Sequence, residues 1–307
     1  MSDSVRDDHV PNLDPPAGRN PDRPGNGGRP RKSPQALREL ALSLGALALA
    51  LLLGGLLLTL SGYDVREAYI NLYDGAFGNL YSLADTLLNS IPLLFTGLAV
   101  AFAFRGGLFN IGAEGQLYVA ALTSAVLALH LPHTWGAALI PLSLLGGALA
   151  GASWGFLPGY LKARMGAHEV ITGIMLNYVA ILLTTWLLKA YFKGPGPIDH
   201  TALIPPAARL PELIATTRLT WALFIALGLT LLVWWVLERT SFGMDLQAVG
   251  QNPGAAAYAG VPVPSRTILI MALSGAIAGL AGSTMVLGVL HRFVARFSPG
   301  YGYTGLA

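Results

Sequence analysis

The 307-residue chain is apolar and weakly charged, with 53% hydrophobic residues, 11% charged residues and a mean hydropathy of +0.56. Soluble proteins carry about 25% charged residues, so this composition excludes an ordinary soluble domain and indicates membrane helices. A net charge of +3 is too small to indicate a nucleic-acid partner. The absence of cysteine excludes disulfides and thiol chemistry but leaves the compartment open.

The N-terminal region differs from the rest of the chain. Residues 1–37 contain many prolines, glycines and mixed charges without an apolar period, so they predict a disordered cytoplasmic tail. Residues 38–307 are predicted to form one transmembrane domain. Its first apolar run, Leu40–Leu60, would be about 31 Å long as a helix, matching a hydrocarbon core of about 30 Å. Because a secretory signal has a shorter apolar core, this run predicts an uncleaved first span.

The sequence predicts an all-α, polytopic bundle of about seven spans with membrane lipid around it. The further apolar runs are Leu83–Phe104, Gln116–Leu131, Trp135–Leu161, Val170–Ala190, Leu219–Leu237 and Thr267–Leu290. The run Gln116–Leu131 is short, so we expect it to start inside the membrane from a broken helix. Seven spans with a cytoplasmic N-terminus place slightly more Lys and Arg on the cytoplasmic side, in the direction of the positive-inside rule.

Small residues recur at every fourth position in two of these runs (Gly147, Gly151, Gly155 and Gly159; Ser274, Ala278 and Gly282). In lipid such faces allow helices to approach closely. We expect packing within the chain, with pairing between two chains as the alternative.

The sequence contains no G-x-x-x-x-G-K-[ST] loop for a nucleotide, no H-E-x-x-H and no G-x-S-x-G. Nothing therefore predicts a metal site, a cofactor or a catalytic residue, and we do not expect an enzyme.

A first polar segment, Gly106–Gln116, lies between two apolar runs and contains four glycines in addition to Asn110, Glu114 and Gln116. Irregular backbone at membrane depth is tolerated only against protein or a water-filled cavity, and broken helices recur in transporters. An ordinary loop at the membrane surface fits the pattern equally well.

A second segment, Ala167–Tyr178, opens a span with a charged pair and contains Glu169, Thr172 and Asn177. Structural roles explain these residues individually. Glu169 is favoured at a helix N-terminus by the helix dipole, and Asn177 can bond to a neighbouring helix.

A third segment, Glu238–Val261, is the longest connection on the predicted cytoplasmic side. Asn252-Pro253 predicts a helix start, the following alanines favour a helix, and Gly260 predicts its end. A short helix of this kind can dock into a groove on a soluble partner, or it can be a plain surface helix.

The stretches at residues 107–116, 168–178 and 248–261 resemble, in this order, signature stretches of bacterial nucleoside and simple-sugar ABC importer permeases. That group includes ribose and branched-chain amino-acid permeases. The resemblance runs from about Leu40 to the last residue. It implies a permease subunit of the inner membrane that pairs with a second permease subunit. A separate ABC ATPase drives such subunits, and an extracytoplasmic substrate-binding lipoprotein supplies the nucleoside or simple sugar, or alternatively a branched-chain amino acid.

The resemblance also implies residue roles. It places Asn110, Glu114, Gln116, Glu169, Thr172 and Asn177 along the substrate pathway, and Asn252, Pro253, Ala256, Tyr258 and Gly260 at the contact with the ATPase. His168, Gly254 and Ala257 depart from the usual pattern. In relatives the stretch at 297–307 continues into further spans, so we expect this sequence to be incomplete at its C-terminus.

Two other classes of membrane protein fit the sequence less well. An ion-coupled secondary transporter predicts carboxylates in mid-span, whereas Asp85, Glu114, Glu169 and Glu238 are expected at or near span ends. A membrane-embedded enzyme is disfavoured by the missing catalytic motifs.

Overall fold

The computed structural model describes residues 34–214 and 216–307. In these ranges the chain is helical, and its extended parts form only isolated bridges at His200–Val294 and Glu212–Thr220. The all-α prediction is therefore confirmed. The predicted tail lies, up to residue 33, outside the described residues. Contacts divide the chain into two units, residues 1–68 and 69–307.

The first unit contains α1 (Pro34–Leu60), a helix of 27 residues. It is about 40 Å long at 1.5 Å per residue, more than the thickness of a hydrocarbon core. Most of its described leucine side chains are exposed, and they are distributed around the whole helix. This is the pattern expected for a helix surrounded by lipid. Asp64 then caps α2 (Val65–Phe77) by accepting backbone hydrogen bonds from Arg66 and Glu67 at 2.8 and 3.1 Å. The apolar pattern did not predict α2, because its residues are of mixed polarity.

The other helices are α3 (Leu80–Arg105), α4 (Ala113–His130), α5 (Leu139–Met165), α6 (Glu169–Leu187), α7 (Ala222–Arg239), α8 (Ser241–Gln251), α9 (Pro253–Tyr258), α10 (Val263–Met285) and α11 (Tyr301–Thr304), with short helical turns at His133–Ala138, Leu188–Phe192, Pro206–Ala208 and Val286–Leu290. Within the described ranges, six helical segments are long and apolar enough to cross a membrane, those built on α1, α3, α5, α6, α7 and α10. The remaining predicted span, Gln116–Leu131, corresponds to α4. It is helical over 18 residues but falls outside this set, because Glu114 and Gln116 in its first turn lower its hydropathy.

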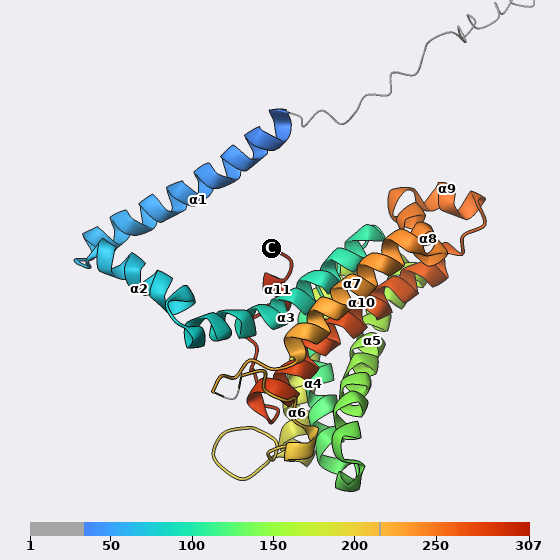
Figure 1. Ribbon diagram of the computed structural model, residues 1–307. Helices are drawn as coiled ribbons and strands as arrows, with labels where there is room; N and C mark the ends of the chain where they lie inside the picture. Colours follow the sequence, from blue (N-terminus) through green and yellow to red (C-terminus); the bar gives the residue numbers. More distant parts are fainter. Residues whose placement is uncertain (1–33, 215) are drawn as a thin grey trace, which may run out of the picture. The chain divides into compact units, whose positions relative to one another are not determined.

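The helices of the second unit run between two ends (Figure 1). One is here called the α9 end. There Arg105 is the last residue of α3, and its Nη1 lies 3.8 Å from Oε1 of Glu238, near the end of α7. At the other, here called the loop end, segment 193–221 bonds to the chain that follows α10, for example through the Leu210 N–H and the Leu287 carbonyl at 2.9 Å. Helix α3 ends at the α9 end. Helix α4 ends at the loop end, where His130 contacts Phe192, so the chain crosses from one end to the other between the last residue of α3 and the last residue of α4.

The core of this unit is built around α10, which packs against α5, α4 and α3. Glycines make the contact with α5 very close. A Cβ atom on Gly155 would lie 3.1 Å from the Cα of Gly275, and one on Gly279 would lie 3.2 Å from the Cα of Gly151. The small-residue faces thus pack within the chain, as expected.

Candidate functional site

The backbone between α3 and α4 (residues 106–112) is interrupted inside packed protein. Gly107 has a φ of +72°, a left-handed conformation that favours glycine. A Cβ atom on Gly107 would lie 2.9 Å from the Cα of Gly250. The predicted helix break is therefore confirmed, and the surface-loop alternative is wrong, because the polar residue at its centre, Asn110, is fully buried.

Asn110 and Gln116 form a closed pair of side-chain amides. The Asn110 Nδ2 donates to Gln116 Oε1 at 2.8 Å, and the Gln116 Nε2 donates back to Asn110 Oδ1 at 3.0 Å. Asn110 Nδ2 also donates to Ser274 Oγ of α10 at 2.7 Å. Both amides are completely buried, and they hold the interrupted backbone against α4 and α10.

Asn177 of α6 bonds to the interruption and to the first turn of α4. Its Oδ1 accepts a hydrogen bond from the Gly115 N–H at 2.8 Å, and its Nδ2 donates to the Ile111 carbonyl at 2.8 Å. The same Nδ2 donates to the hydroxyl oxygen of Tyr303 at 3.1 Å. The side chain of Asn177 is fully buried, so its amide is a positioning group for the broken helix.

The segment of residues 296–304 forms a second interruption after α10, and α4 holds it in place. The Gly302 N–H donates to Glu114 Oε2 at 2.6 Å, and the Ser298 N–H donates to the Tyr118 hydroxyl at 3.2 Å. Glu114 and Tyr118 are one helical turn apart and thus share a face of α4. Together with Asn177, they bring the two interruptions together.

Glu114 is buried, with 2% of its surface exposed. Glu114 lies in the first turn of α4, near the end of that helix as expected, but its side chain is enclosed by the bundle. A buried carboxyl group in a membrane protein is costly, and here one of its oxygens accepts a hydrogen bond from the Gly302 N–H.

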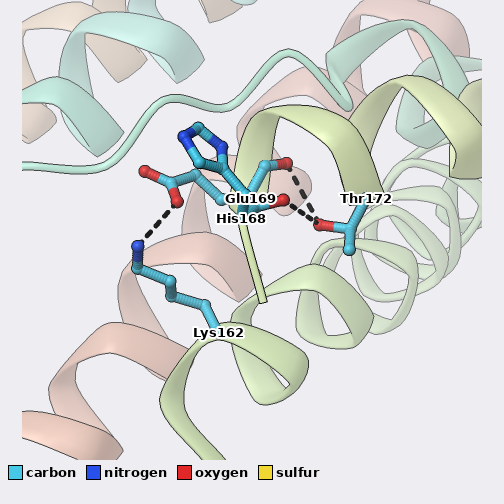
Figure 2. Close-up of polar contacts among 4 residues, drawn as sticks. All are labelled: Lys162, His168, Glu169 and Thr172. Carbon is cyan, nitrogen blue, oxygen red and sulfur yellow. Dashed lines mark hydrogen bonds and ion pairs between the residues drawn. The ribbon is translucent and has the colours of Figure 1, made fainter. Parts of the chain in front are cut away.

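Glu169 and Thr172 lie apart from this group, at the start of α6 (Figure 2). Glu169 Oε2 forms an ion pair with Lys162 Nζ at the end of α5, at 2.9 Å. The Thr172 hydroxyl donates to the backbone carbonyls of His168 and Glu169, each at 3.1 Å. Glu169 thus ties α5 to α6 at the α9 end, and Thr172 bonds within its own helix. A role for either residue in a substrate pathway remains a prediction.

The third predicted segment forms two helices. The Asn252 Oδ1 caps α9 by accepting from the Ala255 N–H at 3.0 Å, Pro253 is its first residue, and Gly260 follows it with a φ of +88°. The predicted helix is confirmed, whereas α8 was not predicted. Ala256 is 3% exposed and packs inside its own chain, whereas Tyr258 is 97% exposed. Of the predicted ATPase contacts, Tyr258 is thus accessible and Ala256 is not.

One cavity, of about 530 Å³, lies beside the second interruption, and none of residues 106–112 lines it. Its polar and aromatic lining comes from α4, α6 and the 296–304 segment: Glu114, Tyr118, Tyr178, Arg296, Ser298 and Tyr303. Of the six predicted pathway residues, only Glu114 lines it. The sequence reading missed the tyrosines and Arg296, although the four-residue spacing of Glu114 and Tyr118 and the Asn177-Tyr178 pair were available signals. The described residues contain no acidic, histidine or cysteine cluster that could hold a metal ion.

Comparison with known proteins gives the family. A family model described as branched-chain amino acid transport system / permease component matches residues 82–307. The chain is 38% identical to the guanosine ABC transporter permease protein NupP of Bacillus subtilis over 88% of this chain and 79% of NupP. It is 34% identical to the nucleoside ABC transporter permease protein NupB of Lactococcus lactis, over 88% and 77% of the two chains. It is 32% identical to the glucose ABC transporter permease protein TsgB13 of Haloferax volcanii, over 84% and 70%. No solved structure matches the chain.

Proposed function

The chain belongs to the family of branched-chain amino acid transport system permease components, and on this premise we propose that it translocates a nucleoside. As a member of this family it is a multi-pass membrane protein and a permease subunit of an ABC importer for nucleosides or sugars. It is a transport subunit and not an enzyme.

The observation that carries the proposal is the 530 Å³ cavity beside the interrupted backbone of residues 296–304, with tyrosine rings, a carboxylate and a guanidinium in its wall. Interrupted backbone at membrane depth accompanies polar pathways in transporters. A nucleoside needs flat apolar surfaces for its base and polar groups for its ribose, and this wall offers both. The relatives named as guanosine and nucleoside permeases support the same substrate class.

A simple sugar is the second candidate, because one relative at 32% identity is named as a glucose permease. Aromatic rings and charged groups also suit a sugar, so the cavity alone does not separate the two. A branched-chain amino acid, the substrate in the family's name, is the third candidate, because its charged groups suit Arg296 and Glu114. The names of the nucleoside permeases, and not the wall, favour the nucleoside over it.

The proposal also covers the partner subunits of the importer and the orientation of this chain in the membrane. An ABC ATPase would bind at the α9 end, where Tyr258 projects from the chain, and that end would be cytoplasmic. A substrate-binding lipoprotein would deliver substrate at the loop end. A second permease subunit would pair with this one in the inner membrane, with the N-terminus of α1 cytoplasmic.

Uptake by cells tests this function. A strain lacking this gene should lose uptake of labelled guanosine while retaining uptake of glucose and leucine, and the gene in trans should restore it. Loss of glucose uptake alone would favour the sugar, and loss of leucine uptake alone the amino acid.

A further inference from the structure

We propose that the 530 Å³ cavity holds the purine base of the nucleoside during translocation, stacked on tyrosine rings and bonded by their hydroxyl groups. The inference rests on the proposed function and assigns the substrate a place within it. The cavity volume lies within the range of about 300–1,000 Å³ that is usual for small-ligand sites.

Three phenol rings from three different elements meet at this cavity: Tyr118 of α4, Tyr178 of α6 and Tyr303 of α11. Aromatic rings offer a flat base a stacking surface that tolerates differences between bases. Rings contributed by separate elements can face a ligand from more than one side. The wall therefore fits a planar heterocycle better than a compact aliphatic group.

Tyr178 is unusual for its depth. It lies near the middle of the span formed by Glu169–Phe192, yet 61% of its surface is exposed. Tyrosines in membrane helices concentrate at the interfaces, where the hydroxyl group reaches water. The described residues leave most of this side chain uncovered, and it lines the cavity, so its hydroxyl group can bond a passing substrate.

The hydroxyl groups of the other two tyrosines are oriented by the protein. Tyr303 accepts a hydrogen bond from Asn177 Nδ2, and Tyr118 accepts one from the Ser298 N–H. Among the described residues neither hydroxyl donates a hydrogen bond, so each proton remains available. Both tyrosines can therefore donate to ligand acceptors, which purines provide at ring nitrogens and at an exocyclic oxygen.

Charged side chains also line the cavity, and one of them connects it to a neighbouring cavity through which a substrate can enter. Glu114 and Arg296 both line the cavity, and they can accept from and donate to a ribosylated base. Arg296 also lines a neighbouring cavity of about 350 Å³ together with Lys189 and Asp199. By contrast, a cavity of about 220 Å³ near Phe102 and Leu229 has only apolar side chains in its wall, which suits a lipid chain and not a nucleoside.

Two measurements on the permease in its importer test this assignment. In the first, 8-azidoguanosine is photolysed with the purified complex, and the labelled peptides are identified by mass spectrometry. We expect label on peptides containing residues 178–182 or 296–303. In the second, guanosine uptake is compared for Tyr178→Leu, which removes the ring, and Tyr178→Phe, which keeps it. Uptake should fall about tenfold in the leucine variant and remain within about threefold of wild type in the phenylalanine variant.

Tyr160→Leu is the matched control, because Tyr160 is an exposed tyrosine of α5 outside the cavity, and it should transport normally. If wild type carries guanosine but Tyr178→Leu does so equally well, or the label lies elsewhere, this assignment is overturned and the proposed function stands. If wild type carries no nucleoside, the proposed function fails and the assignment falls with it.

Discussion

The amide of Asn177 donates to the hydroxyl of Tyr303 at 3.1 Å and so joins the middle of α6 to a segment 126 residues further along the chain. The same side chain bonds the backbone of Gly115 and Ile111. One buried amide thus connects both interruptions of the bundle, and the cavity lies beside the second of them.

Replacing Asn177 by leucine should therefore destabilise the permease. The buried Gly115 N–H and Ile111 carbonyl would lose their side-chain partner, at a cost of about 2 kcal/mol or more. In detergent we expect the Tm of Asn177→Leu to fall by roughly 5 °C, with uptake below a tenth of wild type. Asn89→Leu is the control, because Asn89 is exposed on α3 and bonds only within its helix. Equal Tm values for the two variants would contradict the role of Asn177.

Glu114 should act through its ability to accept a hydrogen bond. Glu114→Leu removes the partner of the Gly302 N–H, whereas Glu114→Gln keeps an acceptor oxygen at the same place. We expect the leucine variant to insert in the membrane but to lose uptake, and the glutamine variant to retain clearly more. Glu67→Leu, at an exposed glutamate of α2, should behave as wild type. Normal uptake by Glu114→Leu at normal expression would contradict this role.

The sequence predicts those structural features that depend on residues close together in the chain. Apolar runs predict the spans, four-residue spacing predicts the glycine contact between α5 and α10, and Asn252-Pro253 predicts the start of α9. Each of these features depends on residues within a few turns of one another. The mixed polarity of α2 gives no comparable signal, and the helix itself was missed.

The candidate site depends on contacts between distant residues. Nothing near Glu114 indicates that it bonds Gly302, 188 positions away, or that α4 begins inside the bundle. The burial of Ala256 is equally non-local, since its small size suits a docking surface and a packed interior alike. The pathway prediction thus selected the buried amides that position the site and missed the tyrosines that line it.

Coupling to an ATPase should depend on Tyr258 and not on direct contact through Ala256. Tyr258→Asp changes a 97% exposed side chain, so the variant should fold normally but lose co-purification with the ATPase and substrate-stimulated ATP hydrolysis. Tyr73→Asp, at another exposed tyrosine, is the control. Ala256→Arg should instead lower the Tm, because it places a charge in a packed site. Normal co-purification of Tyr258→Asp would exclude this residue from the contact.

The local stability of the loop end should depend on pH through Asp199. Hydrogen bonds and ion pairs with Lys189 and Lys193, at 3.0 and 3.2 Å, lower the pKa of the Asp199 carboxyl. A depressed pKa in the folded state stabilises the protein above the unfolded value of about 3.9, and this contribution is lost as the pH falls through the folded value. Asp199→Asn should therefore exchange amide hydrogens faster than wild type around residues 193–200 at pH 7, with the difference shrinking as the pH falls below about 4. A difference that does not depend on pH would contradict this account.

The orientation can be tested with single cysteines, because the natural chain has none. Asn252→Cys should be protected from an impermeant thiol reagent in intact cells, and Ala202→Cys, in the segment between α6 and α7, should react. Both should react after the cells are permeabilised. Labelling of Asn252→Cys in intact cells would reverse the proposed orientation.

The most direct test of nucleoside transport is flux into proteoliposomes that contain the permease with its ATPase and binding protein. With ATP on the side of the ATPase and labelled guanosine on the side of the binding protein, guanosine should accumulate, and Glu114→Leu should abolish the accumulation. Unlabelled adenosine should compete, whereas glucose and leucine should not. Accumulation of glucose or leucine without guanosine, under the same ATP-driven conditions, would contradict the proposed function.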